Sequence, residues 1–169
     1  METARLRLRP LTWDDADNIA TLDADPAVVK YAGGWFRYGG VAPTPELARE
    51  RVLPLLLKTS DDRPTFWAAE DRPTGTFLGW FHLRPTDQPG ELELGYRLIR
   101  AAWGRGLGTE GARLLVGKAF GEWGAVRVVA HALVENRPST GIMEKLGMRH
   151  LKTEMHEPFG MAATYGLER

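Results

Sequence analysis

A run of small residues at positions 104–111, GRGLGTEG, is the segment best suited to bind a ligand. Small residues allow backbone N–H groups at a helix start to approach an anion, whose charge the helix dipole favours. The G-x-G-x-x-G that begins at Gly106 has the spacing of a dinucleotide-binding loop, but the strand expected after it ends in Ala130-His131 without an acid. No Gly-Lys-Ser/Thr follows, as a P-loop would require. We therefore interpret the run as a phosphate-binding turn; a turn that only joins a strand to a helix is the alternative.

A second segment of interest is YAGGWFRYGGV at positions 31–41, which is too rich in glycine for a regular element and too aromatic for a passive linker. Trp35, Phe36 and Tyr38 could enclose a substrate amine. The alternative is that these side chains cover the core, since aromatic residues readily serve as packing.

Hydrophobic periodicity indicates the elements that must position these segments. Between Glu91 and Leu98 the leucines and Tyr96 alternate with polar residues, which predicts a strand with a core face and a polar face. The same reasoning predicts the order βααβββαβαββ in one domain, residues 1–169. The expected strands lie near 6–10, 66–70, 76–83, 91–98, 126–130, 148–155 and 161–167, and the expected helices at 13–22, 45–58, 112–123 and 136–146.

Composition excludes several classes of function. The chain has 22 basic and 22 acidic residues, so no overall field draws it to nucleic acid or to a membrane. It has no cysteine and four scattered histidines, and we expect no metal site. The absence of an apolar leader or of a long apolar run favours a cytoplasmic protein.

Four ordered motifs resemble the GNAT N-acetyltransferase superfamily, and within it the RimJ/RimL-like branch. They are TARLRLRP from Thr3, ELGY from Glu93, WGRGLGTE from Trp103, and NRPS with EKLGM from Asn136 onward. The resemblance implies a mixed α/β GNAT fold, with a mostly antiparallel seven-stranded sheet splayed between strands 4 and 5 and about four flanking helices.

The resemblance also implies that acetyl-CoA is the cofactor, that its pyrophosphate lies on the glycine loop, and that its pantetheine lies along the splayed strand. The residues so implied are Tyr96, Leu98, Ile99, Gly104, Arg105, Gly106, Leu107, Gly108, Thr109, Asn136 and Ser139.

Catalysis by such an enzyme needs a proton acceptor, because alkylamines have a pKa near 10. Glu93 is the candidate base, since the family often places its base on this strand; a solvated strand residue is the alternative. Ser139 matches a serine that some members of the branch use near the leaving sulfur. Met143 stands where the family often has a tyrosine as general acid, and a thioether cannot donate a proton.

The implied activity is direct transfer of an acetyl group to a primary amine, either a protein N-terminus or a small molecule, with Trp35, Tyr38 and Glu91 on the acceptor side. A non-catalytic acyl-CoA-binding module is the alternative, and a nicotinamide oxidoreductase is a third hypothesis. A homodimer through the last strand, near Ala163–Leu167, stays open.

Overall fold

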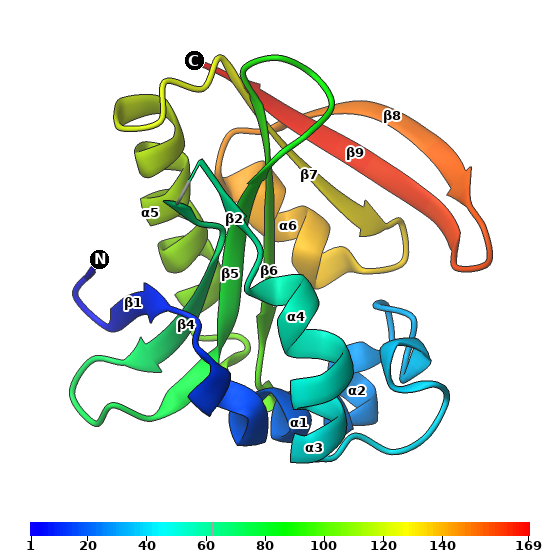
Figure 1. Ribbon diagram of the computed structural model, residues 1–169. Coiled ribbons are helices and arrows are strands. Elements are labelled where there is room, and N and C mark those ends of the chain that lie inside the picture. The colour runs from blue at the N-terminus through cyan, green and yellow to red at the C-terminus, as the bar shows by residue number, and fades with distance from the viewer. Residues whose placement is uncertain (62) are drawn as a thin grey trace.

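The computed structural model describes residues 1–61 and 63–169 and contains a seven-stranded sheet between two helical layers (Figure 1). The order across the sheet is β1-β4-β5-β6-β7-β9-β8, and every neighbouring pair is antiparallel except β6 and β7. The mixed α/β fold and the seven-stranded, mostly antiparallel sheet expected from the sequence are thus confirmed. The strands of this sheet are β1 (Leu6–Pro10), β4 (Phe66–Asp71), β5 (Phe77–Pro85), β6 (Glu91–Leu98), β7 (Arg127–Leu133), β8 (Arg149–His156) and β9 (Gly160–Glu168).

One face of the sheet is covered by α5 (Leu107–Gly121) and α6 (Arg137–Lys145). The alternating leucines of β6 point to this face, where Leu94 packs with Phe81 and Leu115 in the larger of two apolar cores. Burial of such side chains stabilises the fold by about 1.5–3 kcal/mol each. The periodicity in the sequence therefore assigned the two faces of β6 correctly.

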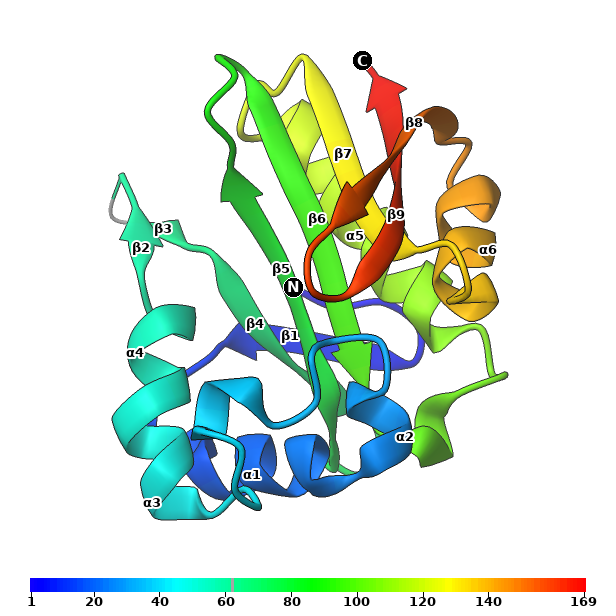
Figure 2. The ribbon, with the colours of Figure 1, turned by 90° about the vertical axis from the view of Figure 1, so that its right-hand side faces the viewer.

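The other face is covered by α1 (Ala16–Ala24) and by the helical segment from Pro45 to Leu56, and Figure 2 views the sheet from this side. Two short elements precede that segment, α2 (Pro26–Val29) and the 3-10 turn η2 (Phe36–Tyr38). Other short turns are η1 (Trp13–Asp15) and η4 (Arg100–Ala102).

The helical segment from Pro45 is not regular. It consists of α3 (Pro45–Leu47), a π-turn η3 (Ala48–Val52) and α4 (Leu53–Leu56). Pro54 lacks an N–H and clashes with the carbonyl one turn earlier, which is the physical reason for the wider turn before it. The sequence predicted one helix over 45–58, and not the short hairpin of β2 (Thr59–Ser60) and β3 (Arg63–Pro64) that follows.

Candidate active site at the divergence of β6 and β7

Strands β6 and β7 are paired only at their first residues. Glu91, Leu92 and Glu93 pair with Arg127, Val128 and Val129, whereas β6 runs on to Leu98 and β7 follows β9 as far as Leu133. From Leu94 onward the edge of β6 therefore carries backbone groups that β7 does not bind. The indole Nε1 of Trp103 donates to the carbonyl oxygen of Leu98 at 2.8 Å and closes the far end of this edge.

The glycine loop leads from this edge into α5. Gly104 and Gly106 have φ of +70° and +78°, a region that glycine enters without steric cost. Helical bonding begins with the Glu110 N–H, which donates to the carbonyl of Gly106 at 3.0 Å. The N–H groups of Leu107, Gly108 and Thr109 come before it and lack a helical acceptor. No side chain of a described residue caps this helix, so its first turn fits an anionic group such as a pyrophosphate.

Arg5 of the first-strand region braces the loop, a role that the sequence did not suggest. Its Nη1 donates to the carbonyl oxygen of Arg105 at 2.8 Å, and its Nε donates to Glu110 Oε2 at 2.7 Å. The bond to Arg105 spans 100 positions along the chain, and no local signal could have revealed it. The Arg5 guanidinium is ion-paired with Glu110, so its contribution to the loop is bracing.

Helix α6 is tied to the free part of β6 through Tyr96. The phenol donates to the carbonyl oxygen of Ser139 at 3.0 Å and lies 3.2 Å from its hydroxyl, and burial raises the pKa of Tyr96 to about 12. Asn136 is the N-cap of α6, accepting from the Ser139 N–H at 3.3 Å. Met143 is 1% exposed and packs in the larger core, so it serves the fold there.

On the opposite face of β6, Glu93 forms an ion pair with Arg84 of β5. Both carboxylate oxygens accept from the guanidinium, at 2.9–3.1 Å. Burial opposes ionisation of Glu93, but His82 and Arg84 together bring its pKa to about 2. The Glu93 carboxylate is therefore charged at neutral pH and attracts an ammonium group, and its role as the general base stays a prediction.

Two histidines that the sequence did not single out lie on the same face. His82 is 7% exposed beneath Gly95, and its two ring nitrogens have no hydrogen-bond partner among the described residues, although Nε2 lies 3.5 Å from Glu93. His131 of β7 is exposed, and its Nδ1 lies 2.9 Å from Thr164 Oγ1. Burial lowers the pKa of both imidazoles.

His131 and Glu93 line one hollow of about 440 Å³ on this face of the sheet. Glu91 also lines it, but its carboxylate accepts from Thr86 at 2.9 Å and pairs with Arg127 at 3.4 Å. The remaining lining residues are Arg84, Pro85, Thr86, Asp87 and Gln88. The hollow therefore lies on the face of the sheet opposite α5.

The aromatic loop is mostly packing. Tyr38 is 1% exposed and its hydroxyl donates to Asp23 Oδ2 at 3.0 Å, so the expectation that it contacts an acceptor is wrong: the ring is buried among core residues. Trp35 is partly buried, with its Nε1 donating to the carbonyl oxygen of Asp23 at 3.0 Å. The loop reaches the β8–β9 turn, where a Cβ on Gly33 would lie 2.8 Å from the Phe159 ring (Figure 2).

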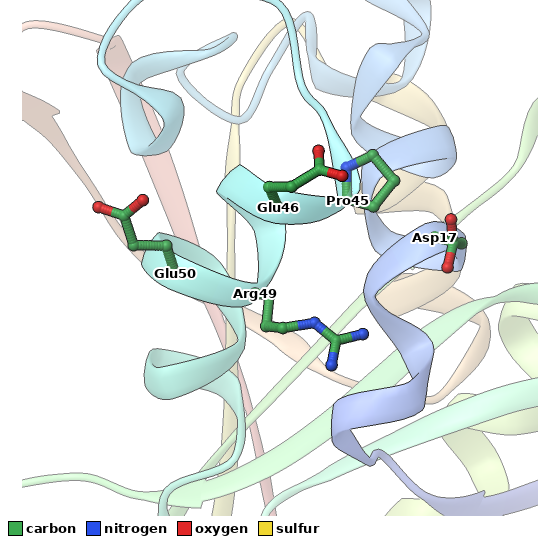
Figure 3. Close-up of a pocket in the computed structure, with 5 residues that line it drawn as sticks. All are labelled: Asp17, Pro45, Glu46, Arg49 and Glu50. Atoms are coloured by element: carbon green, nitrogen blue, oxygen red, sulfur yellow. The ribbon is translucent and has the colours of Figure 1, made fainter.

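Another hollow, of about 450 Å³, lies between α1 and the segment from Pro45 (Figure 3). Its lining residues are exposed apart from the half-buried Pro45, and Arg49 extends across it toward α1, which carries Asp17 (Figure 3). None of His82, Glu93 and His131, the group of side chains described above on β5, β6 and β7, lines this second hollow.

Residues 1–61 and 63–169 contain no group of three histidine or acidic side chains able to hold a metal ion. None of the helices in these two ranges combines the length and apolar character needed to cross a bilayer.

Comparison with known proteins identifies a matching family. The family model described as acetyltransferase (GNAT) domain matches residues 5–149. FsC-acetyl coenzyme A-N(2)-transacetylase of Aspergillus fumigatus is 31% identical over an alignment of 161 residues, which covers 90% of this chain and 66% of that protein. The chain thus spans slightly less than two thirds of this relative's length.

Solved structures show the same fold. A GNAT-family acetyltransferase from Bacillus anthracis superposes with a TM-score of 0.82 at 20% identity, over 99% of this chain and 97% of that one. Aminoglycoside acetyltransferase AAC(6')-Ib in complex with coenzyme A superposes with a TM-score of 0.74 at 20% identity, over 97% of this chain and 95% of that one.

Proposed function

The chain belongs to the GNAT acetyltransferase family, and from this premise we propose that it is an acetyl-CoA-dependent N-acetyltransferase that acts on a primary amine by direct transfer. GNAT acetyltransferases use acetyl-CoA, and a structural neighbour was solved with coenzyme A. The Aspergillus relative is named as a transacetylase acting at N(2). Motifs similar to the RimJ/RimL branch favour peptide N-termini as one acceptor class, and small amines are the other.

The observation that carries the proposal is the unpaired edge of β6 next to the open first turn of α5. Free N–H groups of Leu107, Gly108 and Thr109 would hold the pyrophosphate, with Arg5 bracing the loop. The edge of β6 from Leu94 to Leu98 would hold the pantetheine through backbone hydrogen bonds. Bound acetyl-CoA supplies the thioester that the amine attacks.

In this proposal the side chains on the two faces of the sheet take different roles in the reaction. Glu93, ion-paired with Arg84, attracts the acceptor ammonium into the hollow. Ser139, next to the Tyr96 phenol, lies on the α6 side and returns a proton to the leaving sulfur. A thiol pKa near 8.5 makes this proton transfer undemanding, which fits a weak acid such as a hydroxyl.

The test is a calorimetric titration of acetyl-CoA and CoA, followed by measurement of thiol release with a panel of amines and short peptides. The proposal expects binding of both compounds and thiol release that depends on the acceptor. Glu93→Gln should raise the acceptor KM, with little effect on CoA affinity. Failure to bind acetyl-CoA would refute the proposal.

The second candidate is a non-catalytic acyl-CoA-binding module, and Met143 is the observation that favours it. This thioether is buried in the core at a position where the family often has a proton-donating tyrosine. Both functions predict CoA binding. Binding without thiol release across the whole panel would favour the module.

A further inference from the structure

The place of His131 in the sheet brings it to the mouth of the divergent strands. On β7 it follows Val129, the last residue paired with β6, by two positions, so the two side chains share a face. Since Val129 pairs with Glu93, the imidazole lies about 7 Å beyond that pair along β7, on the hollow's wall. It is therefore beside the point where an acceptor would meet the free edge of β6.

The orientation of the His131 ring is set by β9. Nδ1 lies 2.9 Å from Thr164 Oγ1, and the two residues are partners in the β7–β9 ladder. When Nδ1 donates to this hydroxyl, Nε2 carries the free lone pair. Nε2 has no hydrogen-bond partner within the described part of the chain, and the side chain is exposed.

The other titratable groups on this face are less suited to take a proton from an amine. Both oxygens of Glu93 are engaged by Arg84, and Glu91 is held by Thr86 and Arg127. The nitrogens of His82 lie under Gly95 and are closed to solvent. Of the groups on this face, His131 combines exposure with a fixed ring.

Charged groups around His131 come from two strands, β6 and β8. Glu91 and Glu93 of β6 favour its protonated form, whereas Lys152 and His156 of β8 disfavour it. Partial removal from solvent at the wall of the hollow is the largest influence and lowers the pKa of His131, which favours the neutral imidazole. A neutral imidazole is the form that accepts a proton.

We propose that Nε2 of His131 is the general base that removes a proton from the acceptor amine, with Thr164 as the residue that positions the ring. The proposal rests on the proposed N-acetyltransferase function. It adds a catalytic residue on β7, and it assigns Glu93 to attraction of the ammonium group.

Protons and electrons balance over the proposed reaction. The acceptor ammonium gives one proton to His131 Nε2, and the neutral nitrogen forms a bond to the acetyl carbonyl carbon. The carbon–sulfur bond breaks, its electron pair stays on sulfur, and the second nitrogen proton reaches the thiolate to give free CoA thiol. His131 then releases its proton to solvent, so the net reaction yields amide, thiol and one proton.

The experiment compares His131→Gln and His131→Asn with wild type, using the best amine from the panel and acetyl-CoA. General-base catalysis contributes about 10²- to 10⁴-fold, so kcat/KM for the acceptor should fall by about a hundredfold or more. In the wild type, the pH profile of kcat/KM should have an acidic limb set by the His131 pKa. This limb should disappear in both His131 variants. The control His150→Gln changes an exposed histidine of β8 that contacts Thr153 and should keep the wild-type profile.

Thr164→Val separates positioning from chemistry. The substitution removes the hydroxyl that fixes the His131 ring and keeps the shape of the side chain. We therefore expect kcat to fall, and the pH profile of kcat/KM to keep its acidic limb. Histidine C2–H resonances give the His131 pKa independently of turnover, with His131→Gln providing the assignment. That pKa should lie below the ordinary histidine value and match the kinetic limb.

The outcomes distinguish the two proposals. Turnover that survives in both His131 variants with an unchanged pH profile would overturn the base assignment and leave the acetyltransferase standing. A His131 pKa that differs from the acidic limb of the kinetic pH profile would overturn the base assignment too. Absence of wild-type turnover with every amine would overturn the acetyltransferase and the base together. Calorimetry with CoA must show unchanged affinity in the variants, which confirms that they are folded.

Discussion

The phenol of Tyr96 donates a hydrogen bond of 3.0 Å to the carbonyl oxygen of Ser139 and joins the free end of β6 to the first turn of α6. This single contact bridges the two elements that face the expected path of the pantetheine. It gives the half-buried Tyr96 phenol a hydrogen-bond partner beside the strand edge that β7 leaves free.

Tyr96→Phe should therefore destabilise the protein. Loss of one such hydrogen bond costs about 1 kcal/mol in the free energy of unfolding, because the Ser139 carbonyl loses its donor. Tyr165→Phe is the matched control, since that phenol makes only a long, exposed contact of 3.4 Å with Glu144. Urea unfolding of both variants measures the difference; equal stability of the two would show that the bridge does not contribute.

Arg5→Gln should weaken CoA binding. The substitution removes the guanidinium that holds Arg105 and Glu110, so the loop must be ordered by the ligand itself. Loss of a charge-assisted hydrogen bond corresponds to about a tenfold or larger increase in the CoA Kd. Calorimetry checks this, with Arg7→Gln as control because Arg7 makes only a loose contact of 4.0 Å with Glu70. A wild-type Kd for Arg5→Gln would contradict the bracing role.

Gly106→Ala and Gly117→Ala should change stability in opposite directions. Gly106 has a φ of +78°, where alanine costs about 1–2 kcal/mol, and its Cβ would lie 3.6 Å from the Arg5 Nη2 that braces the loop. Gly117 lies inside α5, where an added Cβ would meet open space, so alanine should add about 0.5–1 kcal/mol. Thermal unfolding and CoA titration measure both effects, and weaker CoA binding is expected only for Gly106→Ala.

Asp15 should make stability depend on acid pH. Burial opposes its ionisation, but hydrogen bonds from Arg9, the Thr12 N–H and Asn18 lower the pKa of Asp15 below the ordinary 3.8. Because the folded pKa is the lower one, the stabilisation is complete above about pH 4 and is lost as the pH falls through the folded pKa.

Urea unfolding between pH 2 and pH 7 tests this expectation. Asp15→Asn should lower the free energy of unfolding at pH 7 by about 3 kcal/mol, since Arg9 loses a buried partner, and should flatten the acid dependence. Asp14→Asn, which alters an exposed neighbour, should keep the wild-type curve. A steep acid dependence in Asp15→Asn would assign the effect to another carboxylate.

The sequence by itself determined the features that depend on neighbouring residues. Alternation between Glu91 and Leu98 predicts both faces of β6, Asn136 marks the start of α6, and the glycines at 104 and 106 mark the open turn before α5. Each of these features depends on local backbone geometry or on the two-residue period of a strand. Both can be recognised from a short stretch of sequence.

Only the tertiary structure decided which distant groups share the site. Arg5 meets Arg105 across 100 positions, and His131 meets Thr164 across 33, because the chain returns to the same sheet after long connections. Packing between elements likewise decides that Tyr38 is buried against Asp23. It also decides that the pKa of Glu93 is low, because Arg84 lies beside it. Burial and electrostatic environment are properties of the assembled sheet, so residue type and spacing along the chain could not reveal them.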